Sequence, residues 1–289
     1  MSDDTMFPRF AAHWLDRLAV TPGKAPDLAA RAPDAVPPRL SKDKARDHMA
    51  GLLPEIDRLQ YLLYADARSS LLIVLQGLDA AGKDGTIRHV MSAMNPQGVR
   101  VVSFKQPTPV ETAHDFLWRV HKVAPGRGEV AVFNRSHYED VLITRVHELL
   151  PHATWQARFA QINAFEDLLA ANGTKILKFF LHISPEEQLK RFRERLNDPA
   201  RQWKISESDY TERQFWSRYM DAYEEAIERT STPAAPWYVI PSDRKWVRNL
   251  AVGQIVAQAL HAMHLSTPPI SVNLADIRKR FHDAQARPD

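Results

Sequence analysis

The sequence predicts an α/β fold in which a parallel sheet is wrapped by helices. Strand-like apolar runs alternate with helical stretches from residue 71 onward, and such alternation is typical of parallel sheets. The first run, residues 71–75, also leads directly into a glycine-bounded loop that carries one lysine, residues 77–86. A buried strand, a tight turn and a helix start in this order are the layout of a phosphate-binding loop.

Periodicity places the individual elements. Strands are expected at residues 71–75, 99–104, 129–133, 175–181 and 237–240. Helices are expected at residues 84–94, 111–122, 139–149, 154–172, 185–197, 208–230 and 245–264, with an amphipathic helix at 41–68 ahead of the core. The helix that begins at residue 185 has a clear start, because Ser184 is a good N-cap and a proline and a glutamate follow it.

Composition limits the class of protein. The 289 residues suffice for one large α/β domain, and hydrophobic and charged fractions of 44% and 25% are ordinary for a soluble protein. Cysteine is absent, which excludes disulfides, thiolate metal sites and thiol catalysis. The N-terminus lacks a signal-like apolar core, and no apolar run is long enough to span a bilayer. We therefore expect a cytoplasmic protein with neither membrane nor nucleic acid as partner.

The chain divides into three parts. Residues 1–40 are expected to form a proline-rich N-terminal arm, since five prolines in residues 21–38 remove backbone donors and block helix continuation. Residues 41–268 are expected to form a single domain. Residues 269–289 are expected to be a frayed C-terminal tail.

The phosphate loop deviates from the usual pattern, G-x-x-x-x-G-K-[ST], in which the final hydroxyl holds Mg²⁺. Asp84 takes the place of that hydroxyl, and Asp79 adds a second carboxylate inside the loop. Two carboxylates repel a phosphate unless a metal ion lies between them. The alternative is a tight strand–helix turn that happens to contain Lys83, which we consider the weaker reading. The expected phosphate-binding residues beside Lys83 are Gly77, Ala80, Ala81, Gly82, Asp84, Gly85 and Thr86.

The segment at residues 130–141 offers a second group of polar residues. In phosphate-loop kinases an acid at the end of a second strand anchors the metal, but here the strand ends in the neutral Asn134. Asp79 is therefore the expected metal ligand, with Asp84 and Glu139 as secondary candidates. Arg135 lies at the strand's carboxyl edge, where it could bind a phosphate; the alternative is an ion pair with Glu139.

A basic stretch at residues 188–204 carries six cations and two acids. Arg191 and Arg195 are one helical turn apart and share a helix face. A proline breaks the helix after Asp198, so residues 185–208 form a helical hairpin placed to close over phosphates as a lid, with Lys204 as a further contact. A solvated helix face is the alternative. Lys105, in a proline-stiffened loop after the second strand, could meet an acceptor phosphate.

Four segments in chain order resemble the type-2 polyphosphate kinase family, over residues 40–265. They are GLDAAGKDGTI from residue 77, FKQPT from 104, FNRSHYED from 133, and RFRER from 191 with DP at 198 and WK at 203. The KDG and FNRSHY variants resemble the class III branch. The resemblance implies a thymidylate-kinase-like P-loop fold, a three-layer arrangement with a five-stranded parallel sheet and a basic helical lid. It also implies reversible, Mg²⁺-dependent phosphoryl transfer from inorganic polyphosphate to AMP or ADP, with Mn²⁺ as a substitute and a homo-oligomeric assembly.

Residue roles follow from the same resemblance. Asp79 would bind the metal, Lys83 and Arg135 would grip phosphates, and Arg191, Arg195 and Lys204 would act from the lid. Asp79, Lys83, Arg135 and Arg195 would form the catalytic group, and Lys105, Asn134 and Arg135 would bind the nucleotide. Other branches carry an acid at Asn134, which links this position to acceptor range as a hypothesis.

Two other functions fit the same residues. One is an ATP-dependent nucleoside monophosphate kinase, which would use the same loop and lid. The other is a non-catalytic module that binds polyphosphate or nucleic acid. Phosphate oxygens of AMP and ADP are already ionised near pH 7, so the reaction needs no side-chain base. The metal carboxylate inside the loop favours an enzyme over a binding module.

Overall fold

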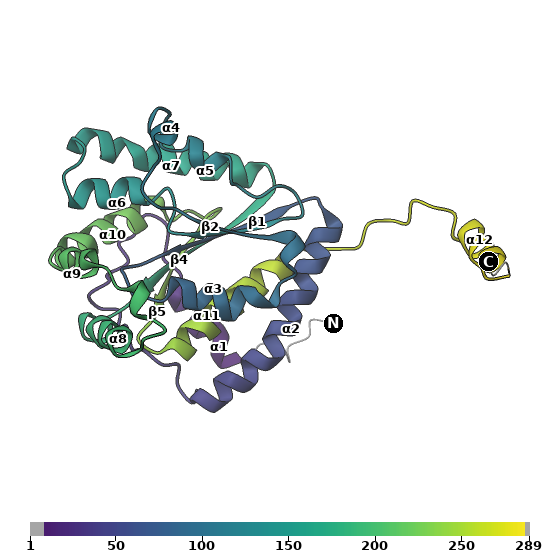
Figure 1. The fold of residues 1–289 in the computed structure, drawn as a ribbon, viewed down its shortest axis with the longest axis horizontal. Helices are drawn as coiled ribbons and strands as arrows, with labels where there is room; N and C mark the ends of the chain where they lie inside the picture. The colour runs from purple at the N-terminus through teal and green to yellow at the C-terminus, as the bar shows by residue number, and fades with distance from the viewer. Residues whose placement is uncertain (1–8, 287–289) are drawn as a thin grey trace.

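The computed structural model describes residues 9–286 of the chain, with side chains from residue 14 onward (Figure 1). Its centre is a five-stranded sheet in which every neighbouring pair is parallel. The strands run in the spatial order β2 (Val99–Ser103), β3 (Val130–Asn134), β1 (Ser70–Gln76), β4 (Thr174–His182) and β5 (Trp237–Pro241). The predicted α/β class and all five predicted strands are confirmed.

Helices cover both faces of the sheet (Figure 1). One face carries α2 (Lys42–Asp66), α3 (Lys83–Val90) and α11 (Lys245–Ala262), and the other carries α6 (Glu139–Val146), α7 (His152–Ala171) and α10 (Trp216–Thr230). Every residue of the central strand β1 is buried. Leu71, Ile73 and Leu75 enter one core cluster, whereas Leu72 and Val74 enter the other. A strand buried on both faces reads as a continuous apolar run, which is why β1 was predictable.

The strand order places the site. The connection from β1 crosses to the edge strand β2, whereas the connection from β3 crosses to β4 on the other side of β1. Chain connections therefore leave in opposite directions between the neighbouring strands β1 and β3. Ligands of open α/β sheets bind at such a switch point, beyond the carboxyl ends of the strands.

Two predicted helices are each split in the structure. Residues 111–122 contain α4 (Pro109–Thr112) and α5 (Trp118–His121), because Asp115 accepts a hydrogen bond from the amide of Leu117 and starts a new turn. Residues 208–230 contain α9 (Glu207–Arg213) and α10. The amides of Gln214 and Phe215 bond to carbonyls only three residues back, which tightens the end of α9.

The proline-rich segment packs onto the domain rather than forming a free linker. It follows α1 (Arg9–Leu18), a helix that the sequence did not predict, whose Trp14 and Leu18 lie in the core. The carboxylate of Glu224 accepts hydrogen bonds from the amides of Asp27 and Leu28, at 2.7 and 2.9 Å. The segment contains no helix, as its prolines predict, but it is fixed against α10.

The C-terminal segment differs from the predicted frayed tail. It contains α12 (Leu274–Gln285), capped by Asn273, and it extends away from the domain (Figure 1). Along the described residues, none of the helices combines the length and the apolar character that a bilayer crossing requires.

The hairpin predicted to act as a lid, residues 185–208, falls in three helices between β4 and α10. They are α8 (Pro185–Asn197), the 3₁₀ helix η3 (Gln202–Lys204) and α9. Two further 3₁₀ turns, η1 (Met91–Ala93) and η2 (Pro96–Gly98), connect α3 to β2. The predicted hairpin with its break after Asp198 is present, and Ser184 caps α8 through the amide of Glu187 as expected.

Candidate functional site

The loop between β1 and α3 has the backbone conformation of a phosphate cradle. Ala80 and Gly82 have φ values of 61° and 112°, in the left-handed region, so the chain reverses sharply before α3. Gly77 allows a close approach, since a Cβ atom there would lie 2.8 Å from the carbonyl oxygen of Leu181. The loop is therefore seated directly against the end of β4.

Each carbonyl of residues 77–81 accepts a hydrogen bond from a side chain. Lys83 donates to the carbonyls of Gly77 and Leu78, at 2.7 and 3.2 Å. Gln188 and Arg191 on α8 donate to the next ones, and Arg248 on α11 joins them. The bonds reach the carbonyls of Asp79 (from Gln188, 2.8 Å), Ala80 (from Arg191, 2.8 Å) and Ala81 (from Arg191, 3.1 Å, and Arg248, 3.3 Å).

The amides at the start of α3 are left for a ligand. None of the amides of residues 82–85 donates a hydrogen bond to a residue that the structure describes. Unpaired amides at a helix N-terminus, together with the helix dipole, form an anion site. Since the carbonyls are turned toward α8 and α11, an anion in this loop meets donors.

Lys83 is buried, with 8% of its surface exposed. Burial, helped by the nearby charge of Arg135, lowers the pKa of Lys83 to about 8. In the absence of an anion its ammonium group is satisfied by backbone carbonyls alone. The charged form of Lys83 is therefore only weakly stabilised by its surroundings.

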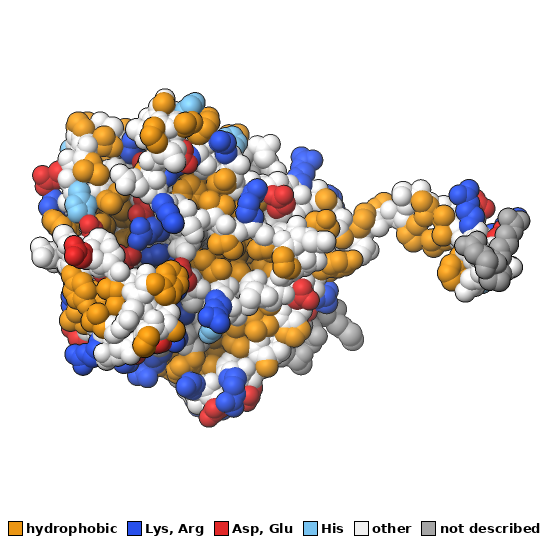
Figure 2. Space-filling view, viewed as in Figure 1, with side chains coloured by type: hydrophobic (Ala, Val, Ile, Leu, Met, Phe, Trp, Pro, Cys, Tyr) orange, Lys and Arg blue, Asp and Glu red, His pale blue; other side chains and the backbone are white. Residues whose placement is uncertain are grey.

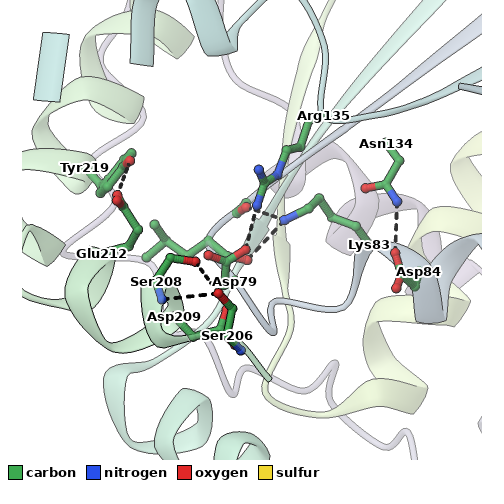
Figure 3. A network of polar contacts seen from close by, with 12 residues as sticks. Asp79, Lys83, Asp84, Asn134, Arg135, Ser206, Ser208, Asp209, Glu212 and Tyr219 are labelled. Carbon is green, nitrogen blue, oxygen red and sulfur yellow. Dashed lines mark hydrogen bonds and ion pairs between the residues drawn. The ribbon is translucent and has the colours of Figure 1, made fainter. Parts of the chain in front are cut away.

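Arg135 and Asp79 form an ion pair at the switch point (Figure 3). Arg135 Nη2 lies 2.7 Å from Asp79 Oδ1. Arg135 has φ of 61°, an uncommon conformation for a residue other than glycine, which turns its side chain back over the loop. Although burial lowers it, the pKa of Arg135 is raised by the carboxylates of Glu139 and Asp79. Among the described residues, the acid that forms an ion pair with Arg135 is Asp79 and not Glu139, the alternative partner that the sequence offered.

Asp84 connects the loop to β3 and to the helical hairpin. Its Oδ1 accepts a hydrogen bond of 2.9 Å from Asn134 Nδ2 (Figure 3), and its Oδ2 lies 3.4 Å from Lys204 Nζ. Burial opposes the change, but the hydrogen bond from Asn134 and the charge of Lys204 lower the pKa of Asp84. Asp84 and Asn134, the two departures from the common pattern, are therefore direct partners.

The two arginines predicted to act from the lid lie in different surroundings. Arg191 is buried, and its Nε, Nη1 and Nη2 groups are all bonded, to Glu187 and to the carbonyls of Ala80, Ala81, Ser242 and Asp243. A guanidinium has five N–H groups, and all five are bonded within the protein. Arg191 therefore positions the loop; it also lines the cleft, and its contact with polyphosphate stays a prediction. Arg195 instead lies 3.7 Å from Asp209 and lines the cleft.

A cleft of about 900 Å³ brings most of the predicted residues together. Its lining includes Asp79, Lys83, Lys105, Asn134, Arg135 and Arg195. Figure 2 shows Lys and Arg side chains gathered in a hollow of this face, between the helices labelled α9 and α3 in Figure 1. Gly77, Ala81 and Thr86 do not line the cleft. The Thr86 side chain is fully buried and its hydroxyl donates to the carbonyl of Gly82, so it acts within the turn.

A buried polar network supports the strand end that carries Arg135. Lys178 Nζ lies 2.5 Å from Glu166 Oε2 and donates to Tyr138 Oη at 2.9 Å, and the other oxygen of Glu166 contacts His137. All four side chains are almost completely buried. Neither this network nor the loop contacts of Gln188 and Arg248 were predicted from the sequence, because the partners are not neighbours in the chain.

The chain was compared with known proteins. The model of the polyphosphate kinase 2 (PPK2) family matches residues 39–268. The chain is 50% identical to an AMP/ADP-polyphosphate phosphotransferase of Meiothermus ruber over 227 residues, 78% of this chain and 85% of that protein. It is 45% identical to an ADP-polyphosphate phosphotransferase of Rhodopseudomonas palustris over 240 residues, 79% and 83% of the two chains.

A solved structure agrees. The crystal structure of polyphosphate kinase 2 from Arthrobacter aurescens superposes with a TM-score of 0.88 at 42% identity, covering 92% of this chain and 95% of that one. Together with the family match over most of the chain, this confirms the predicted P-loop kinase fold. The chain belongs to the polyphosphate kinase 2 family.

Proposed function

We propose that the protein transfers the terminal phosphoryl group of inorganic polyphosphate to AMP or ADP, reversibly. The observation that carries the proposal is the loop itself, whose free amides and buried Lys83 are arranged for an oligophosphate end. The relatives from Meiothermus ruber and Rhodopseudomonas palustris carry names that specify polyphosphate together with AMP or ADP. On that basis we assign polyphosphate as the donor and AMP or ADP as the acceptor of this chain.

The geometry suggests how the two substrates divide the cleft. The donor's terminal phosphates would occupy the loop, next to Lys83 and the amides of residues 82–85. The acceptor phosphate would lie at the strand ends, near Arg135, Asn134 and Lys105, with Arg195 closing from the lid. Acceptor oxygens are already ionised, so catalysis consists of holding two polyanions in line and offsetting their repulsion. The cations of the cleft would supply that compensation.

A divalent cation, Mg²⁺ with Mn²⁺ as a substitute, fits the donor set. Asp79 offers one carboxylate oxygen beyond the one bonded to Arg135, and the described residues contain no group of three acidic, His or Cys ligands. Mg²⁺ is commonly bound by one or two carboxylates plus substrate phosphates and water. Asp79 would therefore hold the ion jointly with the substrates, where the ion would neutralise phosphate charge.

Two alternatives use the same cleft: phosphorylation of AMP by ATP, and binding of polyanions without transfer. The first would use the same loop and lid. The second would not require a metal-binding carboxylate at Asp79. A cytoplasmic location and self-association remain predictions from the sequence.

Incubation of the protein with Mg²⁺, long-chain polyphosphate and either AMP or ADP should yield ADP or ATP, measured by chromatography. Lys83→Met should lower the rate at least about 100-fold, because one preorganised charge contact to the transferred group is lost. Addition of EDTA should stop the reaction. ADP formed only from AMP plus ATP would favour the nucleoside monophosphate kinase, and transfer from neither donor would favour the binding module.

The lowered pKa of Lys83 predicts a pH dependence of anion binding. The lysine is charged below pH 8 and loses its proton above it, whereas sulfate, a phosphate analogue, is fully ionised throughout this range. The Kd for sulfate should therefore rise about fourfold between pH 7 and 8.5, measured by calorimetry. Lys83→Arg, which stays charged, should bind with a flat profile. A flat profile in the unmodified protein would contradict this assignment.

The contact between Asn134 and Asp84 predicts the effect of restoring an acid at the strand end. Asn134→Asp would set two carboxylates about 2.9 Å apart, and the added charge should lower kcat/KM for ADP more than for AMP because ADP is more negative. The double variant Asn134→Asp with Asp84→Asn restores the original net charge of this pair and should recover kcat/KM for both AMP and ADP. An unchanged AMP-to-ADP ratio in the single variant would refute the link between Asn134 and acceptor range.

A further inference from the structure

Arg248 is a buried arginine that lies against the phosphate loop from α11. Only 2% of its surface is exposed. A Cβ atom on Gly82 would lie 1.8 Å from Arg248 Nη1, and one on Gly85 would lie 3.0 Å from Nη2. The guanidinium is therefore packed on the glycine backbone at the start of α3. The absence of a Cβ atom at Gly82 and at Gly85 makes room for the guanidinium.

The charge of Arg248 has no counter-ion among residues 14–286. Its hydrogen bonds go to neutral acceptors, the side-chain oxygen of Asn249 and the carbonyl of Ala81. These bonds use three of its five N–H groups, so two remain. Burial and the charge of Arg191 lower the pKa of Arg248 to about 9. A buried charge is normally paired, but the charge that acts on Arg248 here is that of another cation, Arg191.

The surroundings of Arg248 are positive as well. The free amides of α3 and the positive end of its dipole lie beside it, and Lys83 lies in the same loop. Arg248 also lines the cleft, as do His89 and Lys245, the latter 3.4 Å from the carboxylate of Glu194. A cation placed among cations, with unused donors facing a cleft, is stabilised when an anion arrives.

The position of Arg248 separates the two substrates. Asn134 and Arg135 approach the loop from β3, where Asn134 contacts Asp84, whereas Arg248 approaches it from α11 and contacts Gly82 and Gly85. An acceptor phosphate at the strand ends would not need to reach α11. We infer that Arg248 is a subsite for the polyphosphate donor, binding phosphate groups that follow the transferred one, between α3 and α11.

This inference rests on the proposed function for the identity of the donor. It also accounts for the glycine that directly follows the loop pattern. Gly85 stands two residues after Lys83, and a side chain there would press against Arg248 Nη2. The subsite and the glycine therefore belong together.

The test compares Arg248→Gln and Arg248→Lys with the unmodified protein in steady-state kinetics. For Arg248→Gln, KM for polyphosphate should rise about tenfold or more, the loss expected for charged hydrogen bonds, while KM for ADP changes less than twofold. Arg248→Lys keeps the charge without the fork and should give an intermediate value. Arg229→Gln, an exposed arginine paired with Glu225 on α10, is the matched control and should leave both KM values unchanged.

Thermal unfolding provides a second readout that does not depend on turnover. Tripolyphosphate should raise Tm of the unmodified protein and of Arg229→Gln, and should raise Tm of Arg248→Gln much less. Equal shifts in all three proteins, an unchanged polyphosphate KM, or an equal rise of both KM values would overturn the inference. If Arg248→Gln does not fold, an unchanged polyphosphate KM in Arg248→Lys overturns it equally.

The two proposals can fail separately. If the unmodified protein accepts ATP but not polyphosphate, the proposed donor is wrong, and the same KM comparison with ATP then tests whether Arg248 binds the donor. If polyphosphate is accepted and Arg248→Gln behaves like the unmodified protein, only the subsite is wrong.

Discussion

The hydrogen bonds of Arg191 to the phosphate loop are the contact on which the rest of the site depends. A loop can present its amides to an anion only if its carbonyls are turned elsewhere. Arg191 donates hydrogen bonds to the carbonyls of Ala80 and Ala81. The same guanidinium donates to the carbonyls of Ser242 and Asp243 beyond β5. One buried side chain thus joins the loop after β1, the lid helix α8 and the end of β5. The first two turns of α8 are therefore hydrogen-bonded to the loop, through Gln188 and Arg191.

The site that results is rich in uncompensated positive charge. Lys83 and Arg248 are buried without a carboxylate in contact, and burial lowers the pKa of each. The three acidic groups that line the cleft are already engaged, Asp79 with Arg135, Asp84 with Asn134 and Lys204, and Glu194 with Lys245. Such an arrangement costs stability in the free protein and favours a polyanion when one binds. Asp84, which departs from the common loop pattern, contacts Lys204 of the helical hairpin, and Gly85, directly after the pattern, leaves room for Arg248.

Much of the fold could be predicted from the sequence because β1 and β3 are buried apolar runs and the loop follows the first of them, although the edge strand β2 is largely exposed. Helix boundaries within residues 111–122 and 208–230 could not, because local hydrogen bonds end those helices without a strong sequence signal. Spacing correctly placed Arg191 and Arg195 on one helix face, but it could not tell which of them would be buried. Arg248 was missed because it lies 167 residues from its loop partner Ala81, and an isolated arginine at a helix start forms no local pattern.

Hydrogen exchange of the amides in residues 79–86 tests most directly whether the loop depends on Arg191. Exchange would be followed by mass spectrometry with and without tripolyphosphate, in the unmodified protein and in Arg191→Gln, with Arg229→Gln as control. In the unmodified protein and the control these amides should exchange slowly once tripolyphosphate is bound. In Arg191→Gln they should exchange fast in both conditions, because carbonyls freed from the guanidinium compete for the inner face of the loop. Equal protection by tripolyphosphate in all three proteins would contradict the account.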